Sequence, residues 1–243
     1  MSETVSIYPT GENALTISFG NTIDQEINRK VFKLYQFLLT AAPPFWIDLI
    51  PAYSSLTIIY NPAFAHGQPS TTFDWVKQKI EEALTKTDRI KLPVARHVTI
   101  PLCYHSQFAL DMKLVCAQKK ISTEELIKLH SQQVYHVYML GFLPGFTYLG
   151  TLDSRIATPR LAKPRTQVTA GSVGIAGAQT GIYPLDSPGG WNIIGRTPVK
   201  IFDFSRTEPV LLCPGDAVKF DPISLEEFEN FDPINYQLTQ HEH

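Results

Sequence analysis

The segment Ala170-Gly-Ser-Val-Gly-Ile-Ala-Gly-Ala-Gln-Thr-Gly-Ile-Tyr-Pro184 lies in a part of the chain where glycine is concentrated. Ten of the 14 glycines in the 243 residues fall between Gly141 and Gly195. Many short apolar runs, punctuated by Gly and Pro, predict a closed or nearly closed β-barrel, because closure removes exposed sheet edges. The runs are Val134–Leu140, Val168–Ala170, Gly174–Ala176, Ile193–Ile194, Val199–Phe204, Val210–Leu212 and Val218–Phe220.

The first 90 or so residues have a different pattern, in which strands alternate with helices. Strands are predicted at Val5–Pro9, Ala14–Phe19, Phe45–Ile50 and Leu56–Tyr60. One helix is predicted to start at a capping box of Thr22 and Gln25, and a second helix covers about Thr72 to Lys86. Their buried stripes are predicted at helical spacing, with Ile23, Ile27, Val31, Leu34 and Leu38 on the first and Phe73, Val76, Ile80 and Leu84 on the second. This order implies a small α+β layer with both helices on one sheet face.

The boundary between these two parts is expected near Pro93, after the polar stretch Lys86–Lys91. The fold class is therefore an α+β N-terminal domain, residues 1–92, followed by a mainly-β barrel domain, residues 93–243. A strand at Val98–Leu102 and a helix opened by the capping box of Ser122 and Glu125 begin the second domain. Beyond Val134 there is little helix signal.

Charge and cysteine usage exclude several classes of protein. With 21 Lys+Arg against 23 Asp+Glu, the near-neutral balance argues against a nucleic-acid binder, which usually needs a concentrated basic surface. No apolar stretch is long enough for a membrane helix, and the N-terminus does not resemble a signal peptide. Three widely separated cysteines fit a reducing compartment, so a cytoplasmic location is expected.

Motifs for several common chemistries are missing from the sequence. It contains no phosphate loop, no Gly-x-Gly-x-x-Gly and no His-Glu-x-x-His, and no metal ligand set is recognised. The terminal His241-Glu242-His243 is better explained as a frayed tail than as a metal site.

The glycine-rich segment from Gly141 to Gly195 has no His, Cys or Glu, but it carries aromatic rings, amides, hydroxyls and arginines. These groups suit a small polar or anionic ligand, since arginine can hold a carboxylate through two parallel hydrogen bonds. Plainer roles stay open: the rings as core, the glycines as turns with positive φ, the arginines in salt bridges, and His130 as a structural hydrogen-bonding group.

Three long motifs in the second half resemble those of one family. They are Tyr135-His-Val-Tyr-Met-Leu-Gly-Phe-Leu-Pro-Gly-Phe-Thr-Tyr-Leu-Gly150, the segment Ala170–Pro184 quoted above, and Ser187-Pro-Gly-Gly-Trp-Asn-Ile-Ile-Gly-Arg-Thr-Pro198, with Pro164-Arg165 between the first two. The family is that of the 5-oxoprolinase B subunit, also called allophanate hydrolase subunit 1, and it includes the kinase inhibitor KipI. The N-terminal half resembles it more loosely.

The resemblance implies a cyclophilin-like barrel and a role beside partner subunits. With the 5-oxoprolinase C subunit as its close partner and with the A subunit, the chain would form an ATP-dependent enzyme that opens 5-oxo-L-proline to L-glutamate. The ATP site is expected not to lie wholly on this chain, and activity of the isolated chain is doubtful. Two alternatives remain: inhibition of a sensor histidine kinase, as by KipI, and carboxyl transfer from carboxybiotin, as in urea carboxylase.

The resemblance also implies a set of substrate-binding residues, whereas no catalytic residue is assigned. His130 is carried over either as a structural group or for proton transfer, and Tyr135, Pro188 and Trp191 also match. The binding residues are Phe142, Pro144, Gly145, Phe146, Tyr148, Arg165, Gln179, Thr180, Tyr183, Gly189, Gly190 and Arg196.

The chain departs from the family pattern in three places. Thr151 and Thr169 replace a usual Gly and Pro. In the segment Cys103–Asp111 only Phe108 and Asp111 match, and Gln107 stands where the family has an acid. That loss puts any catalytic role of this loop in doubt.

Overall fold

The computed structural model describes residues 5–41, 43–67 and 70–232. The chain divides into two compact units, Met1–Val94 and Ala95–His243, a division two residues beyond the expected boundary. His241 to His243, the possible metal-binding tail, lie outside the described residues.

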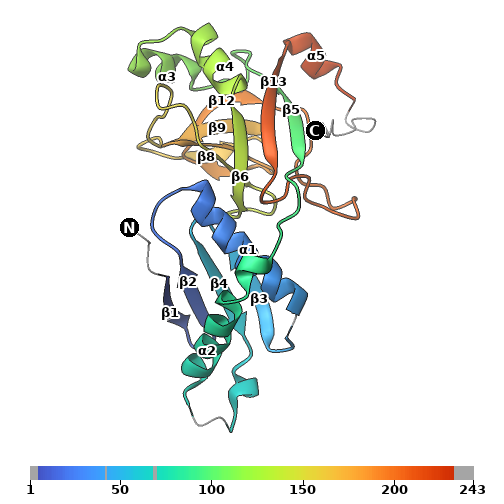
Figure 1. Ribbon diagram of the computed structural model, residues 1–243. Coiled ribbons are helices and arrows are strands. Elements are labelled where there is room, and N and C mark those ends of the chain that lie inside the picture. Colours follow the sequence, from blue (N-terminus) through green and yellow to red (C-terminus); the bar gives the residue numbers. More distant parts are fainter. Residues whose placement is uncertain (1–4, 42, 68–69, 233–243) are drawn as a thin grey trace. The chain divides into compact units, whose positions relative to one another are not determined.

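The N-terminal unit is a four-stranded antiparallel sheet with helices on one face (Figure 1). Its core consists of alternate residues of the central strands, such as Leu56 and Ile58, packed against the stripes Val31–Leu38 and Val76–Ile80. The elements are β1 (Ser6–Gly11), β2 (Ala14–Ser18), α1 (Gln25–Ala41), β3 (Trp46–Pro51), β4 (Ser55–Tyr60), η1 (Pro62–Ala65), α2 (Thr72–Leu84) and η2 (Thr87–Arg89), with strand order β1-β2-β4-β3.

The start of α1 differs from the predicted capping box. The helix begins at Gln25, and the carboxylate of Asp24 accepts the N–H of Ile27 at 2.9 Å. An aspartate is at least as good an N-cap as a threonine, so the helix starts later than Thr22 predicts. Ile23 therefore lies outside the helix and is 45% exposed, and its predicted place in the buried stripe is wrong.

The C-terminal unit is built around a closed seven-stranded barrel (Figure 1). Most neighbouring strands are antiparallel, but β5 and β13 pair in parallel over seven residue pairs. The strands are β5 (His97–Cys103), β6 (Val134–Leu140), β7 (Thr147–Gly150), β9 (Ser172–Ala176), β10 (Gln179–Ile182), β12 (Asn192–Arg196) and β13 (Ala217–Ile223), in the order β10-β7-β6-β13-β5-β12-β9. A separate two-stranded sheet, β8 (Arg165–Val168) with β11 (Ser187–Gly189), and the helices α3 (Met112–Lys119), α4 (Thr123–Ser131) and α5 (Leu225–Glu229) complete the unit.

Several details of this unit were mispredicted. Val199–Phe204 and Val210–Leu212 are not strands, and only an isolated bridge joins Phe202 to Val210. The strand expected at Val168–Ala170 ends at Val168. The short helix α5 follows Val134 despite the weak helix signal, because Ser224 and Glu227 form a complete capping box.

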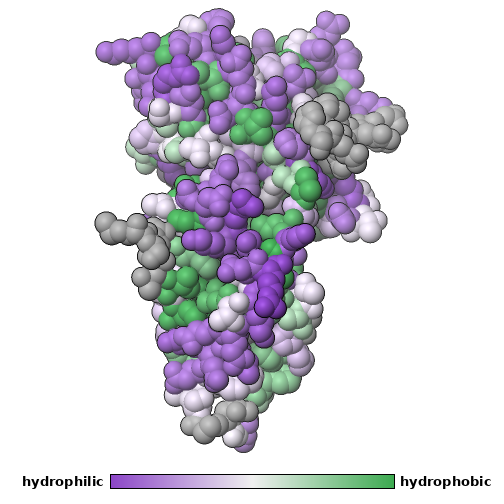
Figure 2. Space-filling model, in the orientation of Figure 1, coloured by the Kyte–Doolittle hydropathy of each residue, from purple (hydrophilic) through white to green (hydrophobic). Residues whose placement is uncertain are grey.

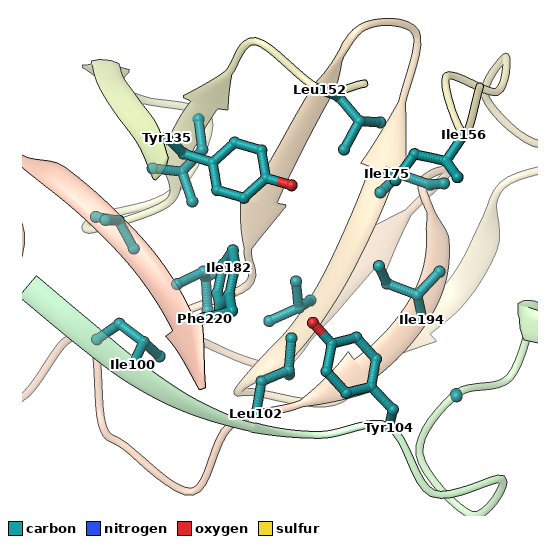
Figure 3. Packing of buried hydrophobic residues seen from close by; sticks show 14 of the residues in the cluster. Ile100, Leu102, Tyr104, Tyr135, Leu152, Ile156, Ile175, Ile182, Ile194 and Phe220 are labelled. Atoms are coloured by element: carbon teal, nitrogen blue, oxygen red, sulfur yellow. The ribbon is translucent and has the colours of Figure 1, made fainter. Parts of the chain in front are cut away.

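The barrel interior is filled with large apolar side chains and two tyrosines. Figure 3 shows Tyr104 and Tyr135 with their rings among Leu102 and Phe220 and their hydroxyl groups directed into the interior. A buried tyrosine hydroxyl needs a hydrogen-bonding partner. The interior must therefore contain polar groups as well.

Over α3 and α4 the surface is mostly hydrophilic in Figure 2, as expected for helices that cover one end of a barrel. No helix within the described ranges has the length and apolar character needed to cross a membrane. All three cysteines carry free thiols.

Candidate functional site

Two glycines on the outer face of the barrel lie directly opposite each other. Gly181 of β10 pairs with Gly174 of β9, and Tyr148 and Ile193 continue this row on the flanking strands. A Cβ at Gly181 would come within 3.0 Å of the Trp191 ring, and one at Gly174 within 2.9 Å of the Trp191 Cβ. Such contacts are too close, so the aromatic side chain requires bare backbone here.

The aromatic side chains predicted for the site gather on this outer face. Phe146 lies at the centre of the cluster, with ring centroids 4.7 Å from Tyr148, 5.0 Å from Tyr183, 5.5 Å from Trp191 and 5.7 Å from Phe142. This arrangement forms a second apolar cluster, separate from the barrel interior. Because residues alternate sides along a strand, the aromatic cluster and the interior share the same strands without touching.

The turn between β6 and β7 positions the edge of the aromatic cluster. Phe142 has φ 67° and is 63% exposed, an uncommon conformation for a bulky residue. Gly145 has φ 81°, as expected for a glycine in a tight turn, and Pro144 beside it is exposed. A Cβ at Gly145 would also meet Phe202 at 3.1 Å, so this turn packs against the loop that carries Phe202.

Neither Gly189 nor Gly190 adopts a positive φ, and only Gly189 is required by close packing. A Cβ at Gly189 would overlap the Tyr183 hydroxyl, while one at Gly190 would lie 3.5 Å from Pro164. The carbonyl of Gly190 accepts a hydrogen bond from Leu161 at 2.8 Å. The absence of a side chain at Gly189 therefore lets β11 lie close to Tyr183 of the aromatic cluster, whereas a Cβ at Gly190 would make only an ordinary contact.

Arg165 is occupied by a carboxylate of the same chain. Its two terminal nitrogens donate to Asp111 at 2.9 and 2.6 Å, a bidentate pair in which the aspartate side chain is 6% exposed. Asp111 also binds Ile193 through both its carboxylate and its backbone N–H, at 2.7 and 2.8 Å. Arg165 therefore has the salt-bridge role that the sequence left open. Its two terminal nitrogens, which would be needed to bind a ligand carboxylate, are already bonded to Asp111.

Arg196, at the end of β12, is the better placed of the two predicted arginines. Its Nε donates to the carbonyl of Ala170 at 2.9 Å, which anchors the side chain. Its guanidinium carbon lies 5.7 Å from the Phe108 ring centroid and 5.9 Å from that of Phe228. Within the described part of the chain no carboxylate lies within 4.0 Å of Arg196. Its two terminal nitrogens can therefore hold a ligand anion.

The altered loop Cys103–Asp111 contacts both arginines through its two residues that match the family pattern. Phe108 touches Arg196, and Asp111 pairs with Arg165. Neither contact needs the acid that Gln107 replaces. The loop therefore keeps a positioning function although its candidate acid is absent.

His130 and Thr180 lie inside the barrel, both fully buried. The His130 Nδ1 is 2.7 Å from the Tyr104 hydroxyl, its Nε2 is 2.9 Å from the Thr180 hydroxyl, and Thr180 donates to the Gly174 carbonyl at 3.1 Å. Since Thr180 uses its proton on Gly174, it accepts from Nε2–H, and Nδ1 accepts from Tyr104. Burial lowers the pKa of His130 to about 3 and raises that of Tyr104 well above its ordinary value.

This buried chain of hydrogen bonds leaves His130 with no ring nitrogen for a proton transfer to a ligand. Tyr135 also donates to the His130 carbonyl at 2.9 Å. The geometry supports the structural alternative for His130. Thr180 likewise faces the interior, on the other side of the strand from the aromatic cluster, so its hydroxyl is not accessible to a ligand on the outer face.

Gln179 is half-buried at the start of β10, beside Ala176 of the aromatic cluster. The prediction missed Arg160, whose guanidinium lies 5.9 Å from the Trp191 ring centroid. In the sequence Arg160 is only one of several charged residues in the glycine-rich segment, and nothing there indicates that it contacts Trp191.

Two surface hollows contain none of the predicted substrate-binding residues. One, of about 340 Å³, is lined by α1 and β3 residues, including Leu38 and Trp46. The other, of about 440 Å³, lies on β5, β6 and β13, including His97 and Lys219. No group of three His, Cys, Asp or Glu side chains suited to a metal ion occurs in the ranges that the structure describes.

Comparison with known proteins places this chain in a family. Residues 5–212 match the family model of the carboxyltransferase domain, subdomain C and D. The chain is 39% identical over 235 residues to the 5-oxoprolinase B subunit of Bacillus subtilis (strain 168), covering 95% of this chain and 98% of the relative. It is 37% identical to the 5-oxoprolinase B subunit of Escherichia coli O157:H7, covering 88% of this chain and 94% of the relative.

Solved structures agree in fold. The crystal structure of TTHA0988 has a TM-score of 0.74 at 35% identity, over 86% of this chain and 40% of that chain. The urea amidolyase of K. lactis has a TM-score of 0.75 at 18% identity, over 94% of this chain and 15% of that chain, which shows a shared fold alone. The aromatic cluster, Arg165 with Asp111 and Arg196 with Phe108 lie within the range matched by the family model, whereas Phe228 lies beyond it. The chain belongs to the family of 5-oxoprolinase B subunits, with the carboxyltransferase subdomain C and D fold.

Proposed function

We propose that this chain is the B subunit of an ATP-dependent complex that hydrolyses 5-oxo-L-proline to L-glutamate. The observation that carries the proposal is the 39% identity to a 5-oxoprolinase B subunit along 95% of the chain. The C subunit as the close partner, the A subunit as a further one, a cyclophilin-like classification of the barrel and a cytoplasmic location are parts of the same proposal.

The proposed share of this chain is to bind the substrate. Ring opening of the lactam consumes one water, and a second water is consumed as ATP becomes ADP and phosphate. A lactam is a stabilised amide, which is why the reaction is coupled to ATP. Arg196 would hold the substrate carboxylate, because its terminal nitrogens have no carboxylate partner among the described residues. Gln179 and backbone N–H groups would steady the negative charge that develops on the lactam oxygen.

The decisive experiment is reconstitution of the complex. The purified chain, mixed with the A and C subunits and ATP, is expected to release glutamate from 5-oxo-L-proline, and the mixture without the chain is the control. No glutamate above that control would reject the proposal.

Arg196 is tested in the same assay by Arg196→Gln, with Arg155→Gln as the matched control. Arg155 is exposed, and its guanidinium already pairs with the carboxylate of Asp153, with an N–O distance of 2.7 Å. Loss of a charge-assisted carboxylate contact is expected to raise the KM for 5-oxo-L-proline about tenfold or more. An unchanged KM would remove Arg196 from the substrate site.

Carboxyl transfer is the second candidate, and the matched family model favours it by its name. This reading requires carboxybiotin as the carboxyl donor. Activity that disappears when avidin sequesters biotin would support it, whereas glutamate release unaffected by avidin would support the lactam hydrolase. If the chain instead inhibits a sensor histidine kinase, it should bind such a kinase and slow its autophosphorylation.

A further inference from the structure

Arg160 presents a positive charge above a buried aromatic ring. Its side chain is exposed, and its guanidinium carbon lies 5.9 Å from the ring centroid of Trp191, which is itself 4% exposed. A guanidinium above an indole ring is held by cation–π attraction. The ring below it packs on the bare backbone of Gly174 and Gly181, so it has little freedom to move.

Arg160 differs in its ion pairing from other arginines nearby. Arg155 pairs with Asp153, and Arg165 pairs with Asp111. Within the described residues no carboxylate lies within 4.0 Å of Arg160. Its terminal nitrogens are therefore available to an anion from outside.

Two phenol groups lie within the field of Arg160. Burial raises the pKa of Tyr148 and of Tyr183, and the positive charge of Arg160 works against that rise in both. The Tyr148 ring is 5.9 Å from the Trp191 ring and half-buried, so it borders the same surface. An exposed guanidinium beside a half-buried phenol can hold an anionic group through charge-assisted hydrogen bonds.

We propose that Arg160, together with Trp191 and Tyr148, forms a second anion-binding site, which takes the carboxylate or phosphate of a small ligand. The site is distinct from Arg196, whose ring contacts are Phe108 and Phe228. It goes beyond the proposed function, because it depends on the charge and rings present and not on which reaction the complex performs.

The test is direct titration of the full chain, without partner subunits, by calorimetry. Four probes separate the two sources of the anion: 5-oxo-L-proline and L-glutamate as carboxylates, and inorganic phosphate and ADP as phosphates. The fluorescence of Trp191 gives a local readout, which is assigned by its loss in Trp191→Phe. Binding that Arg160→Gln weakens and Arg196→Gln does not supports the site, and the class of probe that binds in this way identifies the anion.

Arg160→Gln is expected to weaken the Kd of the binding probe about tenfold or more, since a charge-assisted hydrogen bond is lost. The matched control Arg155→Gln, whose arginine is already paired, should leave the Kd unchanged. Circular dichroism of each variant establishes that it is folded.

Three results would overturn the proposal. They are an unchanged Kd in Arg160→Gln, a Kd that responds to Arg196→Gln but not to Arg160→Gln, and no binding of any probe up to about 10 mM, weaker than any useful site. Each of these leaves glutamate release by the reconstituted complex untouched, so failure here is distinguishable from failure of the proposed function.

Discussion

Replacing Thr180 by valine tests the buried chain of hydrogen bonds in the barrel. The substitution exchanges a hydroxyl for a methyl group of similar size, so the packing volume is retained. It removes the acceptor of the His130 Nε2–H at 2.9 Å and the donor to the Gly174 carbonyl at 3.1 Å. Both side chains are fully buried, so water does not replace the lost partner.

The expected cost follows from that burial. A buried donor left without a partner costs roughly 1–3 kcal/mol, and valine returns little because the methyl of threonine is already packed. We expect Thr180→Val to lower the free energy of unfolding by about 2 kcal/mol, which corresponds to a fall in melting temperature of roughly 5 °C for a unit of this size. Thr180→Ser keeps the hydroxyl and loses only one methyl group, so it should cost about 1 kcal/mol.

The assay is thermal and urea unfolding followed by circular dichroism, with the two variants and the parent side by side. Long-range ¹H–¹⁵N NMR of the imidazole reports the tautomer, which should carry its proton on Nε2. The assigned hydrogen bonds are wrong if Thr180→Val is as stable as the parent, if Thr180→Ser is the more damaging change, or if the imidazole proton is on Nδ1.

Three further predictions concern the C-terminal unit, with one control variant in the N-terminal unit. Burial lowers the pKa of His130 from 6.5 to about 3 in the folded state. The contribution of neutral His130 to the free energy of unfolding is therefore complete above pH 6.5 and falls by about 1.4 kcal/mol per pH unit as the pH drops towards 3. His130→Phe should remove this part of the pH dependence of the free energy of unfolding. Gly181→Ala should lower the free energy of unfolding by about 1–3 kcal/mol, because the new Cβ would lie 2.8 Å from the carbonyl oxygen of Thr147. The control Gly11→Ala, whose Cβ would have its nearest contact at 3.8 Å, should leave the free energy of unfolding unchanged in the same denaturation assay. Asp111→Asn and Arg165→Met should each cost about 3 kcal/mol, and a double-mutant cycle should show that the two costs are not additive.

Predictions from local pattern succeeded where the structure depends on near neighbours. The helix over Thr72–Leu84 agrees with its periodic stripe, and its N-cap is Thr71. Loops that lie against the barrel were harder to assign. Val199–Phe204 has the apolar composition of a strand, but a strand needs a partner along its length. Here the pairing is confined to one bridge between Phe202 and Val210, with hydrogen bonds at the adjacent Ile201 and Asp203. Composition reports burial, and it does not report which backbone groups are paired.

In the candidate site, too, the sequence predicted the segment, and the strand register decided which side each residue faces. The sequence was sufficient to identify the glycine-rich segment between Gly141 and Gly195 as the part that carries the aromatic cluster, because aromatic rings and glycines occur there together. It could not say that Thr180 faces the interior while Gly181 faces the rings, since that depends on strand register.

Only the tertiary structure decided which arginine is available to a ligand. Arg165 and Arg196 are equivalent as residues in a sequence, but Arg165 meets Asp111, 54 residues away, and Arg196 meets no carboxylate of the described chain. Ion pairing between distant residues depends on where the folded backbone places their side chains. The sequence by itself therefore determined the family, the barrel class and the segment that bears the aromatic cluster, whereas the folded structure determined which arginine is paired with a carboxylate of the chain.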